Sequence, residues 1–86
     1  MKRVEVVLEN ETGLHARPAS IFVKEATKFS STISIIKGGK SFNAKSIMSV
    51  LSMGAGKGSK LEIVAEGEDE AEAVIGLKKI IASFAG

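Results

Sequence analysis

The chain has 86 residues, with 12 Lys and Arg against 10 Asp and Glu, and a formal net charge of +2. A chain of this length is expected to form one small domain, residues 1–86, whose shallow core leaves little room for a buried catalytic chamber. With no Cys and one His, disulfides and thiolate zinc sites are excluded, and we expect neither a metal nor a cofactor. No apolar run reaches the roughly 18–20 residues that span a bilayer, and the N-terminus lacks the apolar stretch of a secretory signal. These features predict a cytoplasmic protein without membrane insertion.

The charge balance also argues against a nucleic-acid partner. Basic residues are interleaved with acidic ones, and the only aromatic residues are 4 Phe, which we expect in the core rather than on a base-stacking surface. An anion- or RNA-binding domain that uses scattered Lys remains the weakest of the alternatives.

The first predicted element is a strand at residues 4–8, because Val4, Val6 and Leu8 alternate with Glu5 and Val7. Residues 10–14 follow as a turn in which Gly13 can take a positive φ. A helix is expected next, since apolar residues recur at helical spacing; these are Ala19, Phe22, Val23, Ala26 and Phe29. Pro18 is tolerated only in the first turn, so this helix must begin at about residues 15–17.

Two short strands are predicted at residues 33–36 and 41–43, joined by a turn through Gly38 and Gly39. Ser46 is a suitable N-cap for a short helix that ends before Gly54. A glycine-containing loop at residues 54–59 then leads into the next strand.

The last strand is predicted at residues 61–66, where Leu61, Ile63 and Ala65 alternate with Glu62, Val64 and Glu66 until Gly67. Acidic residues 68–70 suit the start of a closing helix, which continues with apolar residues at helical spacing: Ala73, Val74, Leu77, Ile80, Ile81 and Phe84. Gly76 lies inside that helix, where it costs stability relative to Ala, so we expect a neighbouring element to pack closely there. The order βαββαβα predicts an α+β fold with helices on one sheet face and solvent on the other.

The one His stands at the predicted start of the first helix. A helix N-terminus disfavours an imidazolium by roughly 0.3–1 kcal/mol, which keeps the ring of His15 neutral and nucleophilic. Free backbone N–H groups there would stabilise a phosphoryl group on the ring, and Arg17 could add charged hydrogen bonds. On local physics alone, a surface His15 and a solvated Arg17 are an equally reasonable interpretation.

Ser46 also allows two interpretations, since most helix-capping Ser residues are purely structural. The short helix after it carries more apolar residues than it can bury, so Ile47, Met48 and Leu51 are candidates for an exposed docking patch. Val50 is expected in the core. Other motifs are incomplete. Residues 34–41 lack the first Gly of a nucleotide-binding loop, and the Gly-x-Gly at residues 54–58 follows a helix rather than a strand. No Ser, His and Asp spacing forms a hydrolase signature around the one His.

Two segments, residues 13–19 (GLHARPA) and 43–48 (NAKSIM), resemble the HPr family, and the similarity extends over nearly the whole chain. This family contains the histidine-containing phosphocarriers of the bacterial phosphoenolpyruvate-dependent sugar phosphotransferase system. The resemblance implies an open-faced β-sandwich of four antiparallel strands in the order 1-4-2-3, with three helices on one face. Lys37 and the glycine-rich loop at residues 54–59 differ from common Gram-positive members, which bears on partner preference.

The resemblance also implies roles for individual residues. His15 would accept a phosphoryl group on Nδ1 from phosphorylated enzyme I and pass it to enzyme IIA proteins or domains, with Arg17 as the active-site arginine. Ser46 would be phosphorylated by an ATP-dependent HPr kinase/phosphorylase, as in members from low-GC Gram-positive bacteria. A phosphate there would place negative charge on the face that enzyme I approaches. The partner-binding residues would be Thr12, Ser20, Lys24, Ile47, Met48 and Leu51.

A phosphocarrier of this kind is not an enzyme by itself, and we expect a monomer because transient partners must reach the face around His15. The alternative is a regulatory binding module whose serine-phosphorylated form binds catabolite control protein A, without a carrier role. A related regulatory paralogue lacks the active His, whereas His15 is present here.

Overall fold

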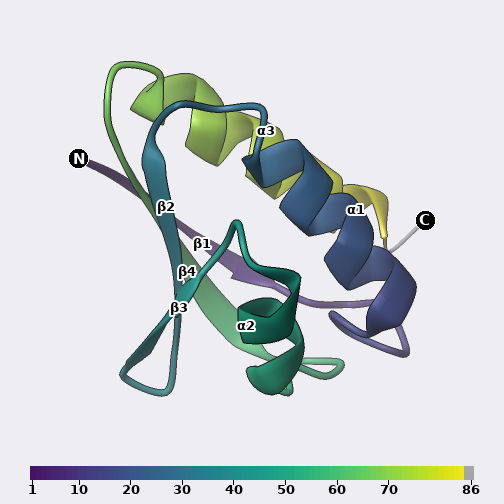
Figure 1. Cartoon of the computed structure of the whole chain (residues 1–86). Coiled ribbons are helices and arrows are strands. Elements are labelled where there is room, and N and C mark those ends of the chain that lie inside the picture. Colours follow the sequence, from purple (N-terminus) through teal and green to yellow (C-terminus); the bar gives the residue numbers. More distant parts are fainter. Residues whose placement is uncertain (85–86) are drawn as a thin grey trace.

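A computed structural model describes residues 1–84 of the chain, and its elements follow the predicted order βαββαβα (Figure 1). The strands are β1 (Lys2–Val7), β2 (Thr32–Lys37), β3 (Lys40–Asn43) and β4 (Lys60–Glu66). The helices are α1 (Ala16–Ala26), α2 (Ile47–Ser52) and α3 (Glu70–Ser83). All strand pairs are antiparallel and the order across the sheet is β1-β4-β2-β3, which confirms the expected fold class.

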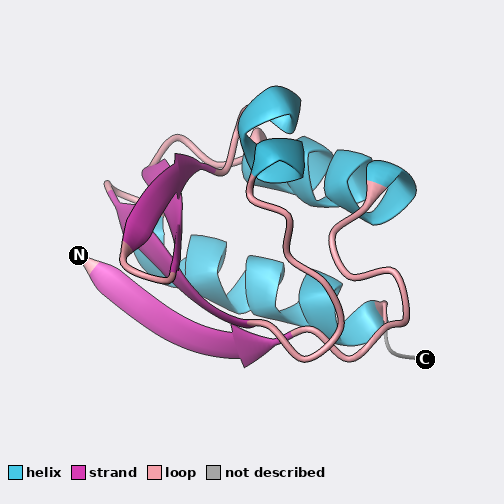
Figure 2. Cartoon of the chain, turned by 90° about the horizontal axis from the view of Figure 1, so that it is seen from below, coloured by secondary structure: helices cyan, strands magenta, loops and turns pink. Residues whose placement is uncertain are grey.

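The three helices lie on the same side of the sheet (Figures 1 and 2). Buried residues alternate with half-buried ones along β2 and β4, as period-2 patterning requires. The buried strand residues are Val6, Ile33, Ile35, Leu61, Ile63 and Ala65. The helices contribute Ala19, Phe22, Ala26, Val50, Ala73, Val74, Leu77 and Ile81 to the same core. The opposite face carries polar residues such as Glu5, Ser34 and Glu62, so it is the solvated face of an open sandwich.

The sharp turn between β2 and β3 is made by Gly38 and Gly39, whose φ values are 57° and 81°. Two consecutive positive φ values are the geometry of a tight hairpin turn that matches strand twist. The Gly-Gly turn predicted from the sequence is confirmed.

The first strand and the first helix differ in extent from the prediction. The strand starts at Lys2 because that residue pairs with Ala65, and it stops before Leu8, whose N–H bonds to the Ser59 carbonyl at 3.0 Å. Helix α1 ends at Ala26, since the backbone tightens there into turns such as Phe29 N–H to the Ala26 carbonyl, 3.3 Å. Phe29 therefore lies beyond the helix in which it was predicted.

Phe29 accounts for the close packing expected at Gly76. A Cβ added at Gly76 would lie 3.0 Å from the Phe29 Cζ, so only a glycine lets α3 approach this ring without displacement. Of the four Phe, Phe22 is fully buried, while the others are partly buried against the core. The prediction that they are core residues thus holds fully for Phe22 alone.

Candidate functional site

The candidate site lies at the start of α1, where His15 is the N-cap residue with extended backbone, φ −86° and ψ −168°. Its carbonyl accepts the first helical bond, from Ala19 N–H at 2.7 Å. Its side chain makes no capping bond, and the first turn of α1 holds no acidic residue. The positive end of this helix is therefore not neutralised by any carboxylate of its own first turn.

Pro18 occupies the first turn, as the sequence required, and it has no N–H to satisfy. Within residues 1–84, no acceptor is bonded to the backbone N–H of Ala16 or Arg17. The side chains of His15 and Arg17 are exposed, and in the same part of the chain neither makes a hydrogen bond or an ion pair. The site thus combines an exposed imidazole, an exposed guanidinium and open backbone donors.

Ser46 lies at the start of α2 as predicted, and its hydroxyl oxygen accepts from the Ser49 N–H at 3.3 Å. The segment before it is fixed by side chains: Ser49 Oγ accepts from Asn43 N–H at 2.9 Å, and Lys45 Nζ donates to the Phe29 carbonyl at 2.7 Å. Ser46 itself is half-buried. Capping a helix start is the structural role of most serines at this kind of position.

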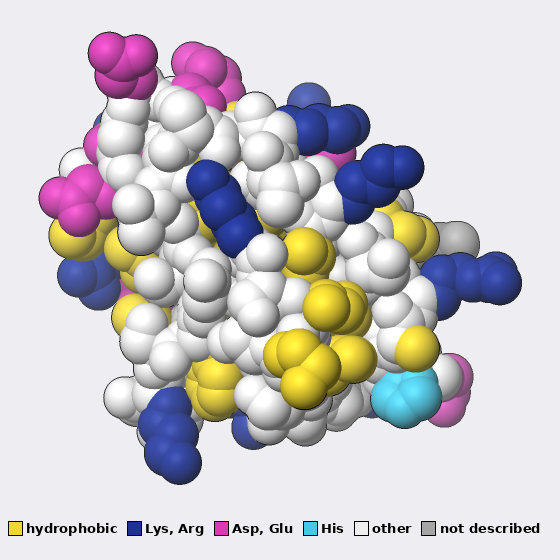
Figure 3. Space-filling model, in the orientation of Figure 1, with side chains coloured by type: hydrophobic (Ala, Val, Ile, Leu, Met, Phe, Trp, Pro, Cys, Tyr) yellow, Lys and Arg dark blue, Asp and Glu magenta, His cyan; other side chains and the backbone are white. Residues whose placement is uncertain are grey.

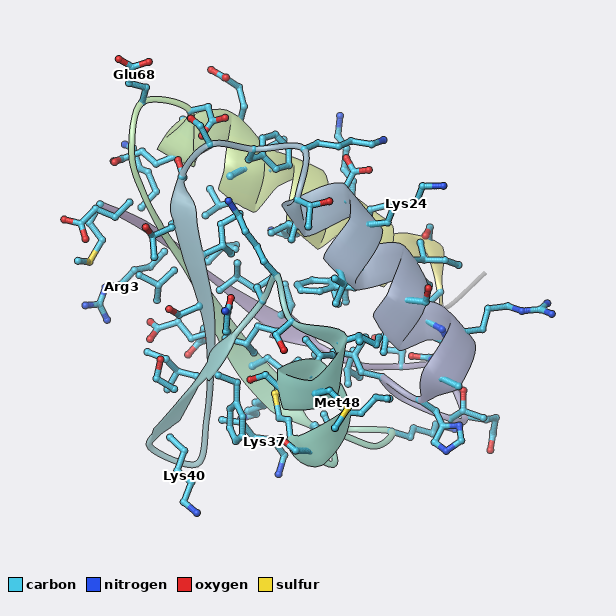
Figure 4. All side chains as sticks on the ribbon, viewed as in Figure 1. Arg3, Lys24, Lys37, Lys40, Met48 and Glu68 are labelled. Atoms are coloured by element: carbon cyan, nitrogen blue, oxygen red, sulfur yellow. The ribbon has the colours of Figure 1, made fainter. Side chains whose placement is uncertain are left out.

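The short helix divides its apolar residues as the sequence predicted. Val50 is fully buried, whereas Ile47, Met48 and Leu51 are 38%, 76% and 41% exposed. Figure 3 shows hydrophobic side chains gathered over α2, with the His side chain close to them, and Figure 4 shows Met48 projecting from this helix. We call Ile47, Met48 and Leu51 the α2 patch.

The remaining candidate residues are exposed and surround this region. Thr12 lies in the loop before His15, while Ser20 and Lys24 lie on α1; Lys24 points away from the helix toward solvent (Figure 4). Helices α1 and α2 pack against each other, which brings the His15 and Ser46 helices to one end of the helical layer. Thr12 and Ser20 therefore lie close to His15 in the chain, whereas Lys24 lies in the last turn of α1, at the other end of that helix.

Two residues of this region were not singled out by sequence reasoning. Ile21 on α1 is 43% exposed. The sequence could have predicted this exposure, because Ile21 falls outside the buried apolar stripe of that helix. Asn10 is half-buried, and its Nδ2 donates to the Gly13 carbonyl at 2.7 Å. No spacing rule marks Asn10, since its contact depends on how the loop folds.

Comparison with known proteins adds family information to this geometry. The family model described as "PTS HPr component phosphorylation site" matches residues 2–83. The HPr-like protein Crh of Halalkalibacterium halodurans is 53% identical over 73 residues, which cover 85% of this chain and 84% of that protein.

Solved structures agree over the full length. The crystal structure of HPr-C-His from Thermoanaerobacter tengcongensis is 49% identical with a TM-score of 0.96, and the match covers 100% of this chain and 97% of that one. The Bacillus subtilis catabolite repression protein Crh, solved as a domain-swapped dimer, is 40% identical with a TM-score of 0.77, covering 100% and 99%.

The T. tengcongensis protein has also been solved as a dimer. The expectation of a monomer is therefore not confirmed for this chain. None of the helices within residues 1–84 is long and apolar enough to cross a membrane.

Proposed function

The chain belongs to the HPr family of phosphotransferase-system phosphocarriers, and from this premise we propose that His15 is its phosphoryl acceptor. The ring would take the group on Nδ1 from phosphorylated enzyme I, so that the bond from phosphorus to the donor breaks as the bond to Nδ1 forms. Enzyme IIA proteins or domains would then receive it in sugar uptake. The chain is a carrier that works with partner enzymes rather than a catalyst by itself.

The observation that carries this proposal is the uncapped start of α1. An exposed imidazole stands beside two backbone N–H groups without acceptors, those of Ala16 and Arg17, and no acid lies in the first turn. Such a helix start stabilises a negative charge through its donors and its dipole. The Arg17 guanidinium is exposed nearby in sequence and can add charge-assisted bonds to phosphoryl oxygens.

We propose that partners dock on the α2 patch, with Thr12 and Ser20 at its polar edge and Lys24 as an additional complementary charge. The α2 patch offers a partner an apolar contact next to His15. Docking there would also position the partner's phosphoryl donor or acceptor near His15. The expected partners are enzyme I, enzyme IIA and HPr kinase/phosphorylase, encountered in the cytoplasm. Arg17 and Lys24 would favour acidic partner surfaces.

Ser46 is proposed as a regulatory phosphorylation site for HPr kinase/phosphorylase. Its hydroxyl is half-buried at the start of α2, directly before Ile47 and Met48. A phosphate there adds negative charge beside the α2 patch and would weaken the approach of enzyme I.

A second candidate function is a regulatory module that acts through Ser46 and catabolite control protein A without carrying phosphoryl groups. It is favoured by one finding, the 53% identity to the HPr-like protein Crh. The exposed His15 favours the carrier, because a module of that kind has no use for a nucleophile at this position.

The test is incubation with phosphoenolpyruvate and enzyme I, followed by intact-mass measurement and acid treatment. We expect one acid-labile phosphoryl group in the wild type and none in His15→Ala, with Ser46→Ala as the control that still accepts it. If the wild type stays unmodified while a kinase and ATP yield an acid-stable phosphate that Ser46→Ala lacks, the regulatory module replaces the carrier.

A further inference from the structure

Asn10 closes the loop that leads into His15 with both its side chain and its backbone. Asn10 Nδ2 donates to the Gly13 carbonyl at 2.7 Å, and the Gly13 N–H donates back to the Asn10 carbonyl at 3.1 Å. These two bonds fold residues 10–13 into a compact turn. Because the side-chain bond requires an N–H donor, the orientation of the Asn10 amide group is determined by it.

The other side of this loop rests on the segment around Ala55. The Leu14 N–H donates to the Ala55 carbonyl at 3.0 Å, and a Cβ added at Gly13 would lie 2.3 Å from that oxygen and 2.6 Å from the Gly56 Cα. Leu14 and Ala55 are both buried. The loop therefore lies directly on the 55–56 backbone with no room for a side chain between them.

Together these contacts hold one peptide plane from both sides. The Gly13 carbonyl and the Leu14 N–H belong to the same peptide group, in which they point in opposite directions. Asn10 binds the carbonyl and Ala55 binds the N–H. This plane is the last but one before His15, so its orientation sets the direction from which the chain enters α1.

Asn10 holds this plane at a cost to folding. Its Oδ1 is buried and, within residues 1–84, has no hydrogen-bond partner. A buried acceptor without a protein donor opposes folding, and a functional role is one explanation for such a group in a native protein.

We propose that Asn10 is a positioning residue for phosphoryl transfer, acting through the Gly13–Leu14 peptide to aim His15 at its partner. The inference rests on the proposed function of His15. A small misorientation of a reacting group slows transfer without weakening partner docking, because docking uses the α2 patch. The stability of the chain should depend little on Asn10, since its removal loses one bond but also relieves one unpaired acceptor.

The experiment compares Asn10→Ala with Ile33→Val, a conservative core substitution in β2 far along the chain from the loop. Three quantities are measured: steady-state phosphoryl acceptance from phosphorylated enzyme I, the thermal unfolding midpoint, and hydrogen exchange of the Leu14 amide. For Asn10→Ala we expect kcat to fall about 10-fold to 100-fold, with KM changed less than about 2-fold. Its midpoint should fall no further than that of Ile33→Val, and Leu14 exchange should accelerate in Asn10→Ala alone.

The outcomes separate this inference from the proposed function. Unchanged Leu14 exchange, or a kcat loss no larger than that of Ile33→Val, would overturn the role of Asn10 while leaving His15 as acceptor. A rise in KM with unchanged kcat would also overturn it, since Asn10 would then act in docking. If the wild type accepts no phosphoryl group, the proposed function itself fails, whatever the exchange data show.

Discussion

The starts of α1 and α3 both carry the partial positive charge of a helix N-terminus, but they differ in the acidic residues placed beside it. Helix α3 begins with Asp69 as N-cap residue and has Glu70 and Glu72 in its first turn, whereas the first turn of α1 contains no acid. Carboxylates near a helix N-terminus offset its positive end. The chain thus supplies α3 with its own negative charge and leaves α1 open.

The carboxylates of α3 are also used in the fold. Asp69 accepts from the N–H groups of Ser30 and Ser31, at 2.8 and 3.0 Å, and from the Ser31 hydroxyl. Glu70 accepts from the Gly67 N–H at 3.1 Å and pairs with the N-terminal amine at 2.7 Å. The start of α3 therefore ties chain segments together, whereas the start of α1 is exposed. This difference fits the proposal that a phosphoryl group binds at the start of α1.

The largest expected effect comes from disrupting the loop that precedes the start of α1. Gly13→Ala introduces a Cβ at φ +59°, 2.3 Å from the Ala55 oxygen, and should destabilise the fold by more than about 2 kcal/mol. Gly38→Ala is the control, because its φ is +57° but no neighbouring heavy atom of residues 1–84 lies within 4 Å of the added Cβ; a loss of about 1 kcal/mol is expected there. Denaturant unfolding measures both, and equal losses would show that the contact with residues 55–56 is unimportant.

The next largest effect concerns the start of α3, where the carboxylates are hydrogen-bonded. The hydrogen bond from the Ser31 hydroxyl, then that from the Ser30 N–H, hold the pKa of Asp69 below its ordinary value of 3.8. Because the folded-state pKa is depressed, this stabilisation is present at higher pH and is lost as pH falls from 3.8 through the folded value. The pKa of Glu70 is likewise lowered from 4.5, chiefly by the N-terminal amine.

Asp69→Asn should therefore lower the thermal midpoint at pH 7 and flatten the pH dependence of stability below about pH 4. Glu72→Gln is the control, since Glu72 makes no hydrogen bond or ion pair within the described residues. Midpoints recorded from pH 2 to pH 7 test this, and parallel curves for the wild type and Asp69→Asn would contradict it.

A smaller loss is expected at the third helix start, which is capped by a hydroxyl. Ser46→Ala removes the acceptor of the Ser49 N–H, a bond of 3.3 Å, and should cost about 0.5–1 kcal/mol. Ser52→Ala, whose hydroxyl only donates to the Ser49 carbonyl on the exposed side, should cost less. Chemical denaturation of both variants would show whether Ser46 is a structural cap in its unmodified state.

The smallest expected change is a gain in stability, which should follow when an acidic residue is placed in the first turn of α1, as in α3. Ala16→Glu puts a carboxylate into the open first turn and should stabilise the fold by about 0.3–1 kcal/mol. It should also slow phosphoryl acceptance about 10-fold, because the new charge repels the incoming group. Ala71→Glu, in the first turn of α3, changes the net charge equally and should leave acceptance unaltered; equal slowing in both would point to net charge instead.

Much of this molecule was determined by the sequence alone. Periodicity, Pro18 and the Gly-Gly turn located the strands, the start of α1 and the hairpin, because each depends on residues close in the chain. The same local reasoning predicted Ser46 as a cap and the exposed α2 patch. The strand order came from family resemblance, since local pattern does not specify which strands become neighbours.

Only the tertiary structure decided how distant segments meet. Phe29 left its predicted helix to pack on Gly76, and residues 55–56 became the support for Gly13 and Leu14. The sequence placed Asn10 in a turn, but its side-chain contact forms only when the loop folds back and its amide reaches the Gly13 carbonyl. The sequence by itself determined the elements and marked His15 as the candidate nucleophile, whereas the loop that leads into His15 is held by contacts between residues more than 40 positions apart.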